Sequence, residues 1–101
     1  MRMYILIRDY VEPKFAIVAA AHASLACYFK FQDHPDMITW KNEVFYKVIC
    51  KVNEKEFENA RSIENNIVIT ESELLGKEVA IAFCPRGIYP KMFNYFRLWN
   101  V

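Results

Sequence analysis

Two kinds of apolar pattern recur along the chain. Residues 3–7 and 78–84 are continuous apolar runs, which are typical of strands buried on both faces of a sheet. Residues 44–52 alternate between apolar and other positions, and this period of two predicts a strand with one face only partly covered. A further short run at residues 66–70 predicts a fourth strand. We expect the first two runs at the centre of the sheet and the alternating strand nearer an edge.

The longest apolar stretch, residues 13–31, predicts a helix of about five turns. Pro13 suits the first helical position, where its missing N–H has no intrahelical partner. Between residues 15 and 29 only His22 and Ser24 are polar, and a helix that is apolar on nearly every side is typical of a protein interior. We therefore expect this helix to be buried, with its many alanines allowing close approach to the sheet.

Three shorter segments, residues 36–40, 54–62 and 90–96, predict further helical turns. The second begins with a capping box, in which Asn53 is the N-cap and Glu56 the third helical residue. The complete order is β, α, short α, β, α, β, β, α. It predicts a single α/β domain over the whole chain, with a mixed four-stranded sheet flanked by helices.

Composition limits the chemistry. The chain has 101 residues and a net charge of +1, so no global field recruits nucleic acid. The three cysteines, Cys27, Cys50 and Cys84, lie in apolar runs, which indicates buried thiols in a reducing cytoplasm. The apolar helix has about 15 residues before Lys30, fewer than the ~20 that a membrane span needs. No spacing for a metal or a cofactor is found, and we expect none of these, nor a membrane partner.

Several segments together carry a resemblance to a known family. Residues 5–9, Ile-Leu-Ile-Arg-Asp, lead into an Ala-rich helix that contains His22-Ala23. Trp40 precedes a strand that reads Lys-Val-Ile-Cys-Lys-Val, a charged helix follows, and the last apolar strand ends at Pro85. In this order and spacing, over nearly the whole chain, the sequence resembles the archaeal and eukaryotic type of peptidyl-tRNA hydrolase. The resemblance implies that fold and cleavage of the ester between a peptidyl group and tRNA.

The catalytic signature of that family is incomplete here. Family members carry a Gly-Lys and then an Ala-Ala-Gln ahead of the His-Ala pair. Counting back from His22, Ala19 holds the glutamine position and Phe15 the lysine position, with Lys14 adjacent. Members also carry an Asp-Ala-Gly-x-Thr segment before the final strand. Counted back from Gly76 without gaps, its specified positions hold Ile67, Val68, Ile69 and Glu71.

The resemblance implies three candidate catalytic residues. Lys14 would act on the oxyanion or the phosphate, and Asp9 or Glu71 would position the attacking water. Glu64 or Glu71 replaces the missing carboxylate only if the loop is shifted. His22 is the third candidate, although in an Ala-rich helix it is also typical of a core histidine whose ring bonds a backbone carbonyl.

Arg8 and Asp9 follow the first strand, and ligand crevices of open α/β sheets lie at the carboxyl ends of strands. The alternative for this pair is a simple ion pair at the end of the strand. If tRNA is a partner, local basic residues such as Arg86 and Lys91 are expected to contact its backbone.

Two functions remain open from the sequence. One is a peptidyl-tRNA hydrolase whose activity is weak or lost. The other is a non-catalytic module that binds a small ligand or a protein partner, or associates with itself. Polar side chains that converge on the crevice favour the enzyme, and a crevice filled by Phe15 and Ile67 favours the module. A homodimer is expected through the aromatic tail, residues 89–99, or through the strand at residues 44–52.

Overall fold

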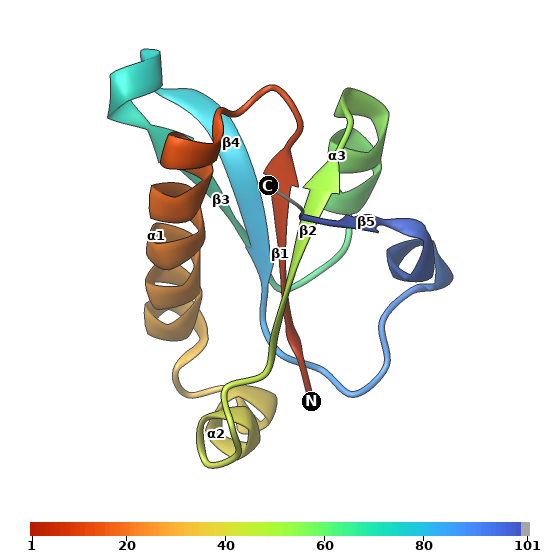
Figure 1. Ribbon diagram of the computed structural model, residues 1–101. Coiled ribbons are helices and arrows are strands. Elements are labelled where there is room, and N and C mark those ends of the chain that lie inside the picture. The colour runs from red at the N-terminus through yellow and green to blue at the C-terminus, as the bar shows by residue number, and fades with distance from the viewer. Residues whose placement is uncertain (100–101) are drawn as a thin grey trace.

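The computed structural model describes residues 1–99 and shows one α/β domain built on a mixed sheet. Neighbouring strands follow the order β3-β4-β1-β2-β5, with β1 and β2 parallel and the other neighbours antiparallel. Figure 1 shows β1 in the middle of the sheet, so the predicted central position of the first strand is confirmed. The strands are β1 (Met3–Arg8), β2 (Lys47–Val52), β3 (Asn66–Glu71), β4 (Lys77–Phe83) and β5 (Arg97–Leu98).

The sheet has five strands where the sequence predicted four. β5 is only two residues long, and it pairs with β2 so that Leu98 lies opposite Cys50 and Arg97 opposite Lys51. A strand this short carries no readable alternation, which is why the pattern did not show it. The strand predicted at residues 44–52 begins only at Lys47.

The helices agree well with the predicted ranges. They are α1 (Pro13–Phe31), α2 (Pro35–Lys41) and α3 (Glu54–Arg61), with short 3₁₀ turns η1 (Ser72–Leu74) and η2 (Lys91–Tyr95). The capping box of α3 is confirmed, because the Asn53 side chain accepts from the Glu56 N–H and the Glu56 side chain accepts from the Asn53 N–H. None of the helices within residues 1–99 is long and apolar enough to cross a membrane.

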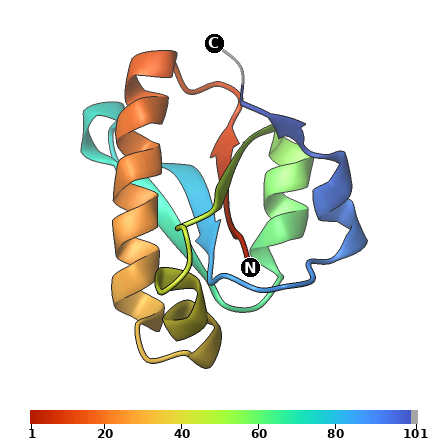
Figure 2. The same cartoon turned by 60° about the horizontal axis from the view of Figure 1, so that its bottom comes forward.

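Helices cover both faces of the sheet, as Figures 1 and 2 show. α1 packs against β1, β3 and β4, and the core on this side contains Ile5, Ile7, Trp40 and Ala82. α3 and η2 lie on the other side, where the core includes Phe57. The alternation of β1 between these two cores explains its continuous apolar sequence.

The expected burial of α1 on every side is wrong. The helix buries one narrow stripe of small side chains, whereas Ile17, Leu25 and Phe29 on its outward side are 69%, 56% and 59% exposed. Small residues let the helix approach the sheet closely, but they also confine the contact to one stripe. The buried residues of α1 are Ala16, Ala19, Ala23 and Cys27.

The aromatic tail, expected from the sequence to be one possible interface, is partly buried and partly exposed, with Tyr95 and Leu98 open to solvent. Phe93 is buried against the sheet, and Tyr89 and Phe96 pack against the same core. The centre of the Phe93 ring lies 5.1 Å from the ring centres of both Tyr4 and Phe83, in edge-on contacts that are favourable for aromatic pairs. Residues 89–96 of the tail therefore complete the core on the α3 side of the sheet, whereas Trp99 packs against the core on the α1 side.

Candidate functional site

Two of the predicted site residues share one end of the sheet. Asp9 lies in the turn after β1, where its N–H donates to the carbonyl of Val52 across 2.8 Å. Lys14 lies in the first turn of α1, and its exposed ammonium is 5.1 Å from the centre of the Phe15 ring. The turn and the helix start therefore place a carboxylate and a cation at the carboxyl end of β1.

His22 lies elsewhere, on the exposed side of α1. It is eight residues beyond Lys14, which corresponds to about 12 Å along a helix axis. The alternative that His22 is a core histidine is wrong, because α1 turns this position towards solvent. The three candidate residues do not form one group in this structure.

Arg8 pairs with α3 and not with its neighbour Asp9. Its guanidinium forms an ion pair with Glu54 and also donates to the Glu78 carbonyl at 3.4 Å. The same group lies 5.0 Å from the centre of the Phe57 ring, so it closes the end of a buried core. This side chain is occupied in holding α3 against β1 and β4.

A second ion pair at this end involves Arg61 of α3. Its guanidinium donates to the Glu78 carboxylate, with one of these contacts at 3.1 Å, and to the Glu58 carboxylate at 3.1–3.2 Å. Hydrogen bonding from Arg61 lowers the pKa of the Glu78 carboxyl, and the same bonds raise the pKa of the guanidinium. Glu78 therefore stays ionised and links β4 to α3, so it is a poor proton donor or acceptor.

The two carboxylates that were considered as replacements lie at opposite ends of β3, and the one at the same end as Asp9 and Lys14, Glu71, is engaged in a helix cap. Glu71 is buried at the end of β3, where its carboxylate accepts from the Glu73 N–H at 3.1 Å and caps η1. Glu64 precedes β3, and the register places the start of β3 opposite the end of β4, so Glu64 lies at the other end of the sheet. A shift of the loop alone would not bring it to Asp9.

Phe15 and Ile67 occupy the positions where the family signature has polar groups, and both pack against the core under α1. The basic residues are scattered as well. Arg86 follows β4 at the end opposite Lys14, where its Nε donates to the Ile88 carbonyl at 2.8 Å. Lys91 starts η2 on the other face of the sheet. These side chains do not outline one continuous polyanion path.

The thiols offer no nucleophile at neutral pH. All three cysteines are free and buried, and burial raises the pKa of Cys27 to about 12 and those of Cys50 and Cys84 to about 11. Within residues 1–99 no three His, Cys, Asp or Glu side chains lie close enough together to hold a metal ion.

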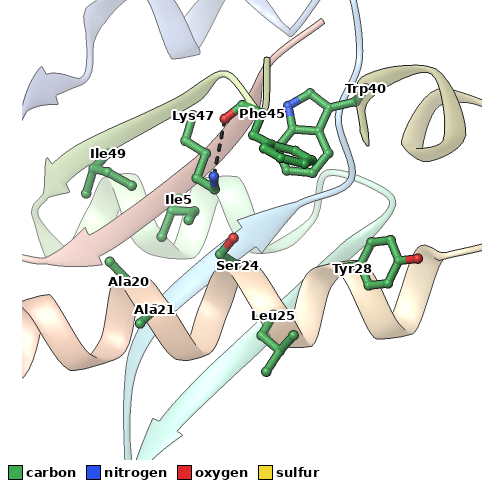
Figure 3. A pocket seen from close by; sticks show the side chains of 10 residues that line it. All are labelled: Ile5, Ala20, Ala21, Ser24, Leu25, Tyr28, Trp40, Phe45, Lys47 and Ile49. Carbon is green, nitrogen blue, oxygen red and sulfur yellow. Dashed lines mark hydrogen bonds between the residues drawn. The ribbon is translucent and has the colours of Figure 1, made fainter. Parts of the chain in front are cut away.

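Two hollows lie between α1 and β2, where the helix leaves part of the sheet uncovered. One has a volume of about 470 Å³ and the next about 330 Å³, and they share Ala20 and Ile49 in their linings. Figure 3 shows the first of these, with Leu25 and Tyr28 on the helix side and Trp40 and Phe45 across from them. We call the two hollows together the α1–β2 groove.

Lys47 is the charged side chain of the α1–β2 groove. Its ammonium donates to the Phe45 carbonyl at 3.2 Å and lies 5.3 Å from the Trp40 ring. Ser24 adds one hydroxyl from α1, and the other lining side chains are apolar or aromatic (Figure 3). Such a lining suits an apolar partner with one anionic or hydrogen-bonding group.

Sequence reasoning did not identify Lys47, Phe45 or Ser24 as site residues. The available signal was the alternation at residues 44–52, which indicated a partly uncovered strand face. What the pattern could not supply was the position of α1 relative to β2. No protein-family model and no curated protein sequence matches this chain.

Proposed function

We propose that this chain is a diverged peptidyl-tRNA hydrolase-like domain in which ester hydrolysis is weak or lost, and that it works as a self-associating binding module. The resemblance of the sequence supports the first part of this proposal. The observed order of elements, with α1 between two parallel strands and a final antiparallel pair, agrees with that resemblance.

The observation that carries the proposal is that apolar side chains occupy positions where the family signature requires polar groups. Hydrolysis of peptidyl-tRNA needs a cation near the phosphate and a carboxylate or hydroxyl that holds water. Phe15 and Ile67 pack against the core at two of the positions concerned. Asp9 and Lys14 remain at the rim, and the nearby Arg8 is paired with Glu54. This set supports binding better than it supports catalysis.

The α1–β2 groove supports the binding part. Its two hollows measure about 470 and 330 Å³, and its lining is mostly apolar, with Lys47 as its cation. Apolar hollows with few convergent polar groups are typical of binding sites. The exposed apolar side of α1 borders the same groove, through Ile17 and Leu25.

We expect the purified protein to release little or no N-acetyl-amino acid from an N-acetyl-aminoacyl-tRNA, a simple mimic of peptidyl-tRNA. Acid-precipitable radioactivity measures the remaining ester directly. The matched variant is Lys14→Ala, which removes an exposed side chain and should leave the fold intact.

Turnover by the wild type that disappears in Lys14→Ala, while the circular dichroism spectrum remains unchanged, would show that the protein is an active hydrolase and contradict the proposal. Turnover that is identical in wild type, Lys14→Ala and Asp9→Ala would indicate a contaminating hydrolase. Absence of turnover together with absence of salt-sensitive tRNA binding would support the module.

A further inference from the structure

The outward side of α1 is apolar over most of its length. We define the α1 outer face as Ile17, Val18, Ala21, Leu25 and Phe29, all of which are exposed. Figures 1 and 2 show α1 at one side of the molecule, with the sheet behind it and no other element across its outward side. A helix side like this is typical of an interface, because isolated surface helices are polar on the side that faces water.

The area of this surface is close to what a stable dimer requires. At roughly 150–200 Å² per large side chain, the exposed parts of the α1 outer face leave roughly 340–450 Å² of apolar surface open. A standard interface takes about 800 Å² from each partner, somewhat more than half of it apolar. The surface therefore supplies most of the apolar area that one partner must contribute.

We propose that the α1 outer face binds the same face of a second copy of this chain, with the two α1 helices antiparallel and the twofold axis near the level of residue 23. This inference deepens the proposed self-association and rests on it, because it names the partner and the contact surface.

The spacing of side chains makes this pairing self-complementary. Val18, Ala21, Leu25 and Tyr28 are separated by three, four and three residues, which is the spacing of the seam between two packed helices. About a centre at residue 23, Ala21 of each copy lies opposite Leu25 of the other, and Val18 lies opposite Tyr28 of the other. Each pair sets a small side chain against a large one, as close packing requires.

The charges also favour the antiparallel arrangement over the parallel one. Lys14 at the start of α1 is brought towards Asp33, which follows the end of α1 in the partner copy. A parallel pair would instead set Lys14 against Lys14 and Lys30 near Lys30. Antiparallel helices also align their dipoles favourably.

The first experiment measures mass by light scattering at high micromolar concentration. We expect the wild type to be a dimer and Leu25→Glu to be a monomer, with the dimer dissociation constant raised at least ~100-fold, because each interface gains two buried carboxylates. The matched control is Ile88→Glu, which changes an apolar side chain that is 84% exposed outside this surface. The control should remain a dimer.

A second experiment tests the antiparallel orientation. His22→Cys should be cross-linked into covalent dimers by a thiol-specific reagent shorter than about 10 Å, the distance between two packed helices. The two residues lie about 3 Å apart along the helix axis when the centre is at residue 23. Lys14→Cys should not be cross-linked, because its two copies are about 27 Å apart along the axis. The wild type, whose three cysteines are buried, gives the background.

A monomeric wild type would overturn the inference, and so would a folded Leu25→Glu variant that remains a dimer. Equal cross-linking of Lys14→Cys and His22→Cys would refute the antiparallel arrangement. Ile17→Asp provides a second disruption of the same surface if Leu25→Glu fails to fold. A monomer that binds anionic lipid vesicles would make the α1 outer face a lipid-binding surface and contradict the proposal.

These outcomes are separate from those of the hydrolase assay. A dimer that also cleaves peptidyl-tRNA would retain the α1 pairing and remove the non-catalytic function. A monomer without turnover would remove the α1 pairing and retain the loss of catalysis.

Discussion

Replacement of Phe57 by alanine should lower the free energy of unfolding by about 3–5 kcal/mol. Phe57 is fully buried on α3, in the core that also contains Leu6 and Val52. Two guanidinium groups lie close to its ring, with the central carbon of Arg8 5.0 Å and that of Arg61 5.2 Å from the ring centre. The variant loses the apolar contacts, leaves a cavity and exposes both ion pairs, so the cost exceeds the transfer of one side chain. For a domain stable by about 5–15 kcal/mol, this is a large fraction of the total.

Urea denaturation followed by circular dichroism measures this change. The matched control is Tyr95→Ala, which removes an exposed aromatic side chain from η2 on the same side of the sheet. We expect the control to change stability by no more than about 0.5 kcal/mol. Equal stability losses in the two variants would show that α3 is not packed as described.

Substitution of Ala23 by leucine should lower the free energy of unfolding by about 2–3 kcal/mol. Ala23 is fully buried between α1 and the sheet, where three further heavy atoms have no space without moving the helix. Overpacking of this kind costs about 1–3 kcal/mol. The upper part of that range applies because the contact of α1 with the sheet consists mainly of small residues.

A thermal melt resolves this effect, because 1 kcal/mol shifts the midpoint by about 4–8 °C in a domain of this size. The control, Ala21→Leu, makes the same change two residues earlier on the exposed side of α1. Both thermal melts should be recorded at low protein concentration, so that self-association does not contribute to the melting temperature. A melting point unchanged in Ala23→Leu would mean that this side of α1 is open.

Local signals predicted most of the fold. Pro13 and the polar turn after Phe31 determined both ends of α1, and the Asn53 and Glu56 pair determined the start of α3. These signals act over a few residues, so a single sequence shows them. β5 was missed because Arg97 and Leu98 form a strand only through their pairing with β2, about 50 residues earlier.

The burial of α1 was mispredicted for a physical reason. The sequence of a helix that is apolar on nearly every side is equally compatible with a place inside the domain and with a place at an interface. Ala23 and Leu25 are both apolar, yet one faces the sheet and the other faces solvent. What distinguishes the two residues is which side of α1 packs against β1, β3 and β4 in the folded domain.

The candidate site was predicted only in part. Asp9 and Lys14 were correctly placed at the carboxyl end of β1, because the order strand, turn, helix requires it. Arg8 was associated with Asp9, whereas its partner is Glu54, 46 residues later. Ion pairs between residues so far apart in the sequence depend on the tertiary fold. Charge alone does not tell which of the 12 acidic residues of the chain pairs with Arg8.

The central claim is that the α1 outer face is covered by a second copy in solution. Methyl relaxation of the wild type with a soluble gadolinium chelate tests this claim most directly, because the probe reaches only uncovered side chains. At concentrations where the protein is dimeric, we predict weak enhancement at Ile17, Val18 and Leu25, and strong enhancement at Leu75 and Ile88, which are exposed elsewhere. Equally strong enhancement at all five residues would contradict the account.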